Sequence, residues 1–192
     1  VKLPMTFPVT LADHASTANF PLDGRQLGRR KEKPIEEQEQ NIDYTVYEEG
    51  IYVGYRHFDK NSIKVSYPFG YGLSYTGFEY ENMEVGVTGD TIIINVTVKN
   101  NGNSAGKEVV EIYVSKPDTE IDRPLQELKA FAKTKLLSPD ETAELTMRIP
   151  MSELSYWNEE KPGWTLGKGI YTINAASSSR DIRLNTDIEL YL

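Results

Sequence analysis

From residue 78 to the end of the chain, short segments with alternating apolar and polar residues follow one another. The clearest is 91–99 (TIIINVTVK), in which Ile92, Ile94, Val96 and Val98 fall on one face and Ile93 is the apolar exception on the other. A period of two places successive side chains on opposite faces of a strand, whereas a helix needs a period of 3.6. Asn-Asn-Gly at 100–102 then supplies turn residues. The segment therefore predicts a half-buried β-strand that ends at a turn.

Six further segments show a comparable pattern. They are residues 78–87, 107–115, 127–136, 141–149, 169–176 and 182–191. The segment 127–136 has a composition compatible with a helix, but its alternation favours a strand. Turn signals recur roughly every 8–12 residues, which is typical of a two-sheet antiparallel sandwich. We therefore predict a mainly β chain with a seven-stranded immunoglobulin- or fibronectin type III-like sandwich, and one helical turn over 151–156 with Ser152 as its N-cap.

The first 43 residues carry little periodic pattern. Residues 1–10 (VKLPMTFPVT) predict a terminal or edge strand interrupted by Pro4 and Pro8, and we expect the other strands of its sheet to lie upstream. Residues 11–43 are polar and include a basic cluster, which indicates a surface loop or linker. The cluster comprises Arg29, Arg30, Lys31 and Lys33. The start at Val1 favours a processed or excised fragment.

Residues 44–78, called the aromatic segment below, connect this linker to the sandwich. Tyr44 and Val46, and then Ile51, Val53 and Tyr55, alternate as strand residues do around Gly50. The stretch from Pro68 to Gly72 predicts a tight loop, since glycine permits close backbone approach. We expect this segment to hold together two dissimilar parts of a protein.

Charge and composition exclude several classes of function. The formal net charge is −8 and the pI is about 4.9, so phosphate backbones and anionic lipid surfaces are unfavourable partners. No apolar run reaches the roughly 20 residues that a membrane-spanning helix needs. The chain has no cysteine, which excludes disulfides, thiolate metal sites and a cysteine nucleophile.

Candidate metal ligands are few. The two histidines, His14 and His57, lie far apart in the sequence, and a metal site needs three or four convergent ligands. Asp118, Glu120 and Asp122 have the spacing of a cation-binding loop but lack its glycine and its distant glutamate, so we interpret them as an acidic surface turn.

The sequence offers no clear pair of catalytic carboxylates. Glycoside chemistry needs two carboxyl groups that flank a sugar. Glu48 and Glu49 lie in an apolar setting, and we interpret them as buried partners of Arg56 rather than as catalysts. The residues alone therefore predict no catalytic, cofactor-binding or metal-binding site.

Four aromatic residues near the C-terminal end leave two alternatives open. They are Tyr156, Trp157, Trp164 and Tyr171. Aromatic faces suit sugar rings, and the two tryptophans flank a polar loop, so they predict a stacking platform in one alternative. In the other alternative, which we favour, they cover the end of the sandwich core.

Five sequence blocks, in this order, resemble the C-terminal part of glycoside hydrolase family 3, and they come closest to its bacterial β-glucosidases and β-xylosidases. They are KLPMTFP (2–8), YEEGIYVGYRHFD (47–59), YPFGYGLSYTGFEY (67–80), RPLQELKAF (123–131) and SSSRDIRL (177–184). His57, Gln126 and Ala130 depart from the common wording, where tyrosine, lysine and glycine are frequent.

The resemblance implies a layout and a function. Residues 1–22 correspond to the end of an α/β sandwich domain, 23–76 to a linker that packs on the catalytic domains, and 77–192 to a fibronectin type III-like domain. The complete enzyme would be a retaining β-glycosidase, with a β-linked oligosaccharide or aryl glycoside as substrate and without a cofactor. The family's nucleophile and acid/base lie upstream, so this segment would stabilise the catalytic domains without catalysing the reaction.

Several expectations accompany this layout. Tyr52, Tyr55, Arg56 and Phe58 should lie against domains outside this chain, which would leave residues 44–68 mobile or self-associating. The loop 119–126 is the part predicted to approach an active-site entrance. The implied location is periplasmic or extracellular, with the cytoplasm as an alternative. The rival functions are a carbohydrate- or surface-binding sandwich module and a homodimerisation module.

Overall fold

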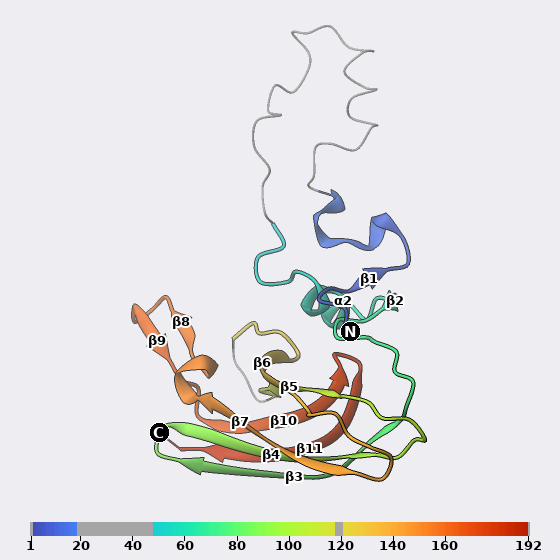
Figure 1. The fold of residues 1–192 in the computed structure, drawn as a ribbon. Helices are drawn as coiled ribbons and strands as arrows, with labels where there is room; N and C mark the ends of the chain where they lie inside the picture. Colours follow the sequence, from blue (N-terminus) through green and yellow to red (C-terminus); the bar gives the residue numbers. More distant parts are fainter. Residues whose placement is uncertain (1, 19–47, 118–120, 192) are drawn as a thin grey trace, which may run out of the picture.

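The computed structural model describes residues 2–18, 48–117 and 121–191. Two antiparallel sheets dominate it (Figure 1). The four-stranded sheet has the order β11 (Asp181–Leu190), β10 (Gly169–Ser178), β5 (Val109–Ser115), β6 (Glu127–Lys133). The three-stranded sheet has the order β3 (Phe78–Thr88), β4 (Thr91–Asn100), β7 (Thr142–Pro150). All seven predicted strands are present, and the predicted fold class is confirmed.

The core lies between the two sheets, where alternation directs the apolar side chains. Ile92, Ile94, Val96 and Val98 of β4 are fully buried, and they pack with residues of β5, β7 and β10 in one cluster. Each buried branched side chain stabilises the fold by about 1.5–3 kcal/mol relative to an exposed one. The core of the sandwich thus comes from the pattern that predicted its strands.

Two elements follow β7 before the last pair of strands. A 3-10 helix, η4 (Met151–Leu154), confirms the predicted helical turn, but its N-cap is Pro150 instead of Ser152. The N-cap lies two residues earlier than predicted, and Met151 and Leu154 of the turn are both buried in the core cluster. A hairpin of β8 (Tyr156–Asn158) and β9 (Gly163–Thr165) comes next and was not predicted.

The N-terminal strand has its partner inside this chain. The strand β1 (Phe7–Pro8) pairs with β2 (Val65–Tyr67), so the expectation that its partner strands would all lie upstream is wrong. Two 3-10 helices, η1 (Leu11–Asp13) and η2 (Ala15–Ala18), follow β1. The N-terminal segment and the aromatic segment therefore pair with one another beside the sandwich (Figure 1).

The alternation of Ile51, Val53 and Tyr55 does not produce a strand. A turn covers residues 48–51, Tyr52 and Val53 have no regular structure, and a helix, α2 (Tyr55–Lys60), begins after Gly54. Gly50 and Gly54 have φ of 54° and 57°, a left-handed conformation that interrupts extended backbone. None of the helices within residues 2–18, 48–117 and 121–191 qualifies as a membrane span.

Candidate functional site

The helix α2 of the aromatic segment packs directly on the four-stranded sheet. The Tyr55 ring meets the ring of Tyr113 on β5 edge-on, with centroids 5.8 Å apart and planes at 82°. The Tyr55 hydroxyl accepts a hydrogen bond of 2.9 Å from the backbone N–H of Leu128 on β6. Tyr113 is fully buried. One tyrosine therefore fixes α2 to two neighbouring strands.

Phe58 lies on the same side of α2, three residues further on, and is 2% exposed. The rings of His14 and His57 pack edge-on against it, with centroids 6.0 and 5.2 Å away. The structure thus brings both histidines to one phenylalanine, where they serve packing. No cluster of three or more metal-ligating side chains occurs among the described residues.

Ion pairs surround this aromatic contact. Arg56 pairs with Glu127 of β6 at 2.9 Å, so the predicted pairing with Glu48 or Glu49 is wrong. On α2, the Arg56 side chain lies against β6, while Glu48 is exposed to solvent. The expectation that Tyr52, Tyr55, Arg56 and Phe58 find their partners only in absent domains is therefore also wrong.

The outer end of α2 is held by Asp122. Its carboxylate pairs with the Lys60 ammonium at 2.9 Å and accepts a hydrogen bond from the Tyr52 hydroxyl. These two donors lower the pKa of Asp122. Asp122 thus serves in an ion pair, while Asp118 and Glu120, its predicted companions in an acidic turn, lie outside the described residues.

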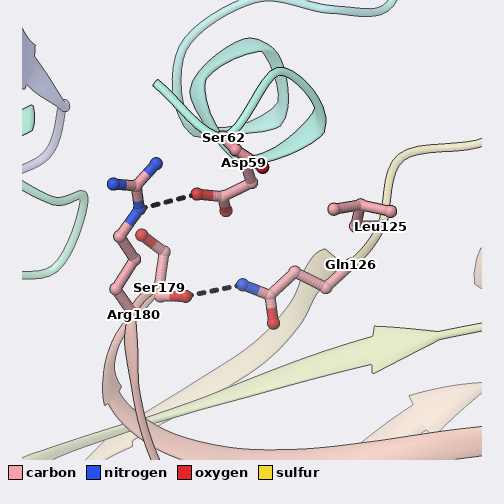
Figure 2. Close-up of a pocket in the computed structure, with 6 residues that line it drawn as sticks. All are labelled: Asp59, Ser62, Leu125, Gln126, Ser179 and Arg180. Carbon is pink, nitrogen blue, oxygen red and sulfur yellow. Dashed lines mark hydrogen bonds and ion pairs between the residues drawn. The ribbon is translucent and has the colours of Figure 1, made fainter. Parts of the chain in front are cut away.

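An open groove of about 490 Å³ separates α2 from the turn between β10 and β11 (Figure 2). Arg180 on that turn crosses it, pairing with Asp59 at 2.8 Å and donating to the carbonyl of Ile63 at 3.0 Å. At the floor, the Gln126 amide donates to the carbonyl of Ser179 at 2.6 Å. The carboxylate and the guanidinium neutralise each other, so the groove has no net charge for a ligand.

The Asp59–Arg180 contact should contribute modestly to this docking. A double-mutant cycle with Asp59→Asn and Arg180→Ala is expected to give a coupling energy of about 0.5–1 kcal/mol, because both side chains retain some solvent exposure and the pair is screened. Urea unfolding of the four proteins measures it. A coupling near zero would show that Arg180 does not hold α2 in solution.

The N-terminal segment is anchored to the sandwich by Lys2. Its ammonium pairs with Glu108 at 2.8 Å and donates to the carbonyl of Ser177 at 2.7 Å. The next residue, Leu3, exchanges backbone hydrogen bonds with Tyr71 and Gly70, at 2.8 and 2.9 Å. The segment, the loop after β2 and the sandwich therefore form one connected joint.

A buried glutamate lies under this joint. Glu111 of β5 is 4% exposed and accepts a hydrogen bond of 2.7 Å from the Tyr113 hydroxyl. Burial raises the pKa of Glu111 to about 7. Gly70 packs against its carboxylate so closely that a Cβ on Gly70 would lie 2.3 Å from Oε2. Gly70 has φ of 79°, so both its space and its backbone favour glycine.

This arrangement connects segments, and its carboxylates are closed to a sugar. A glycosidase needs two carboxyl groups beside an open sugar site. Glu108 and Glu111 are neighbouring carboxylates of this region, but they are 7% and 4% exposed and are covered by Lys2 and Gly70. The joint, defined as Lys2–Leu3, the aromatic segment from residue 48 and the strand residues that they contact, is the candidate functional site.

The aromatic residues near the C-terminal end divide into two groups. Tyr171 is 1% exposed and belongs to the core, as expected. Trp157 and Trp164 are 53% and 74% exposed on the β8–β9 hairpin, so the favoured interpretation that they cover the core is wrong for them. The hairpin, which the sequence did not predict, carries them out of the sandwich.

Comparison with known proteins agrees with the class that this fold defines. A family model described as "Fibronectin type III-like domain" matches residues 108–179. The matched range runs from just before β5 into the turn after β10. The sandwich is thus a fibronectin type III-like domain.

Enzymes of one family align with almost the whole chain. A probable β-glucosidase K of Emericella nidulans is 37% identical over 98% of this chain and 20% of its own length. A β-glucosidase 3B structure from Thermotoga neapolitana, in complex with α-D-glucose, has a TM-score of 0.81 and 38% identity, covering 98% of this chain and 24% of its own. A β-glucosidase of Kluyveromyces marxianus gives 0.85 and 35%, covering 100% and 21%.

The chain matches the C-terminal portion of glycoside hydrolase family 3 β-glucosidases, including their fibronectin type III-like domain. It spans about a fifth to a quarter of the length of these relatives. The resemblance noted in the sequence is confirmed. The division at residues 22 and 76 stays a prediction, since the first boundary lies outside the described residues.

Proposed function

We propose that this chain is the non-catalytic C-terminal portion of a retaining β-glucosidase that hydrolyses terminal non-reducing β-D-glucosyl residues. Its role is to stabilise the catalytic domains through the joint. The observation that carries the proposal is the anchoring of the N-terminal segment by Lys2 and Leu3, because a strand fixed in this way gives an adjoining domain a rigid attachment. The similarity to β-glucosidases over nearly the whole chain supports the reaction.

One face of the N-terminal segment supports an upstream partner. Met5, Phe7 and Val9 alternate along the segment and are 42–55% exposed, while Thr6 between them is 7% exposed. Tyr67 of β2 extends this face, its ring edge-on to Phe7 with centroids 6.4 Å apart. Apolar residues at alternate positions of a strand are those that a partner layer covers. We propose that upstream domains of the same enzyme cover this face.

The isolated chain should not hydrolyse glycosides. We expect no turnover of aryl β-glucoside or aryl β-xyloside by the chain, and turnover of the β-glucoside by the complete polypeptide. The reason is that the neighbouring carboxylates of the joint, Glu108 and Glu111, are buried and covered by Lys2 and Gly70, which leaves no room for a sugar between them. Release of the aryl alcohol, followed by absorbance, measures both proteins under the same conditions.

The complete polypeptide carrying Phe7→Asp provides the matched test of the docking face. Its thermal stability should fall, while an equivalent substitution of the exposed Phe131 on β6 should leave it close to that of the parent. Turnover by the isolated chain at the rate of the complete polypeptide would contradict the non-catalytic role. Equal stability of the two variants would contradict the docking face alone.

A further inference from the structure

The β8–β9 hairpin presents both tryptophans of the chain to solvent. Trp157 and Trp164 are directly opposite one another in its register, with ring centroids 5.8 Å apart and planes at 80°. Figure 1 shows the hairpin standing clear of the two sheets, at the left of the view. The two indoles therefore form an exposed perpendicular corner, called the tryptophan corner below.

The corner is held in place by contacts behind it. Alternation along β8 puts Tyr156 on the opposite face from Trp157, where the Arg123 guanidinium lies 5.0 Å from the Tyr156 ring centroid. Arg123 also donates to the carbonyl of the buried Leu154 at 3.1 Å. The Asn158 side-chain oxygen accepts hydrogen bonds from the N–H groups of Glu160 and Lys161, at 3.0 and 3.1 Å, which closes the turn. A site ordered in advance loses less entropy when it binds a ligand.

The size of the corner selects a small ligand. Two aromatic side chains present at most about 500 Å² of surface, whereas a stable protein interface takes about 800 Å² from each partner. A second copy of the chain or a folded protein therefore needs more surface than the corner offers. The exposed Glu159 and Glu160 beside one lysine disfavour an anionic ligand. A small neutral ligand with an apolar face fits both the limited area of the corner and its acidic surroundings.

The angle between the rings narrows the choice further. Coplanar rings suit a flat glucan surface, but planes at 80° cannot lie on one flat surface together. A perpendicular pair contacts a single sugar ring, one indole against its C–H face and the other at its edge. A β-linked glucosyl unit has equatorial substituents and two open C–H faces, whereas an α linkage places an axial oxygen on one of them.

We propose that the tryptophan corner binds one glucosyl unit of a soluble β-linked gluco-oligosaccharide. The choice of a β-linked glucan rests partly on the proposed function. The site lies on a different element from the joint, because the corner is on β8 and β9 whereas the joint uses β5, β6 and β10. It gives the chain a carbohydrate contact on an element that the joint does not use.

Intrinsic fluorescence tests this proposal directly, because both tryptophans of the chain lie in the corner. Titration of the chain with cellohexaose should give a saturable change in indole emission, and maltohexaose should bind several-fold more weakly. Trp164→Leu should weaken cellohexaose binding about tenfold, the change that loss of one ring contact produces. Phe131→Leu, at an aromatic residue 70% exposed on β6, is the matched control and should bind like the parent.

A second measurement uses the parent chain, so it does not depend on whether Trp164→Leu keeps the hairpin folded. In the ¹⁵N-labelled parent chain, cellohexaose should shift the indole N–H signals of Trp157 and Trp164 and the amide signals of 156–165. No shift there, shifts confined to other elements, or equal binding of both hexaoses would overturn the proposal. Neither readout involves turnover, so failure of this proposal would not contradict the proposed function. Turnover by the isolated chain would likewise not contradict sugar binding at the tryptophan corner.

Discussion

Replacing Phe58 with alanine should weaken the docking of the aromatic segment by about 3–5 kcal/mol, the usual cost of truncating a buried phenylalanine. Phe58 is 2% exposed and carries the ring contacts to His14 and His57, so its removal leaves a cavity between α2 and the N-terminal segment. Native-state amide exchange at Ile63 measures the effect, since the Ile63 N–H donates to the carbonyl of Phe58.

Phe131→Ala is the control for this substitution. It removes the same side chain from a position 70% exposed on β6, where surface changes usually stay within about 0.5 kcal/mol. Urea unfolding of both variants shows whether the loss is local to the aromatic segment or extends to the sandwich. Equal exchange at Ile63 in the two variants would mean that α2 leaves the sheet in solution.

The sandwich was predictable because its signal is local. In β4, the identity of every second residue reveals which side of the strand is buried, and Asn100 to Gly102 marks where it ends. The same reasoning located the other six strands without knowledge of their partners. The order of strands in the two sheets is a long-range property, and the sequence supported it only through the class of fold.

The joint was not predictable because its contacts join distant residues. Ile51, Val53 and Tyr55 satisfy a strand pattern, yet the left-handed Gly54 and the contacts of Tyr55 with β5 and β6 produce a helix instead. Arg56 has acidic neighbours in the sequence but pairs with Glu127, 71 positions away. Similarly, the ion pair between Lys2 and Glu108 has no signal in the sequence, because it depends on the position of the N-terminal segment beside the sandwich.

The tryptophan corner was predictable only in part. The aromatic residues and their polar loop were noticed, but strands of three residues are too short for a periodic pattern. A usable signal was Asn158 with Gly163 across the turn, flanked on each side by a tryptophan. Tyr171 is buried and the two tryptophans are exposed. That difference follows from the hairpin, whose strands are too short to give a sequence pattern.

Glu111→Gln should change how stability depends on pH. In the folded chain burial raises the pKa of Glu111 to about 7 from an ordinary value of 4.5, so the folded state favours the protonated acid. Its stabilising contribution is fully present below pH 4.5 and is lost as the pH rises through 7. The difference over that interval is about 3 kcal/mol.

Glutamine keeps the shape of the side chain and an oxygen that accepts from the Tyr113 hydroxyl, but it carries no titrating proton. We therefore expect the free energy of unfolding of Glu111→Gln, relative to the parent, to increase between pH 4.5 and pH 8. Urea unfolding at several pH values measures the slope, and Glu79→Gln at an exposed position of β3 removes the same charge away from the joint. If Glu111→Gln and Glu79→Gln gave the same slope, Glu111 would have to be ionised and solvated in the folded chain, and Gly70 could not pack against it as observed.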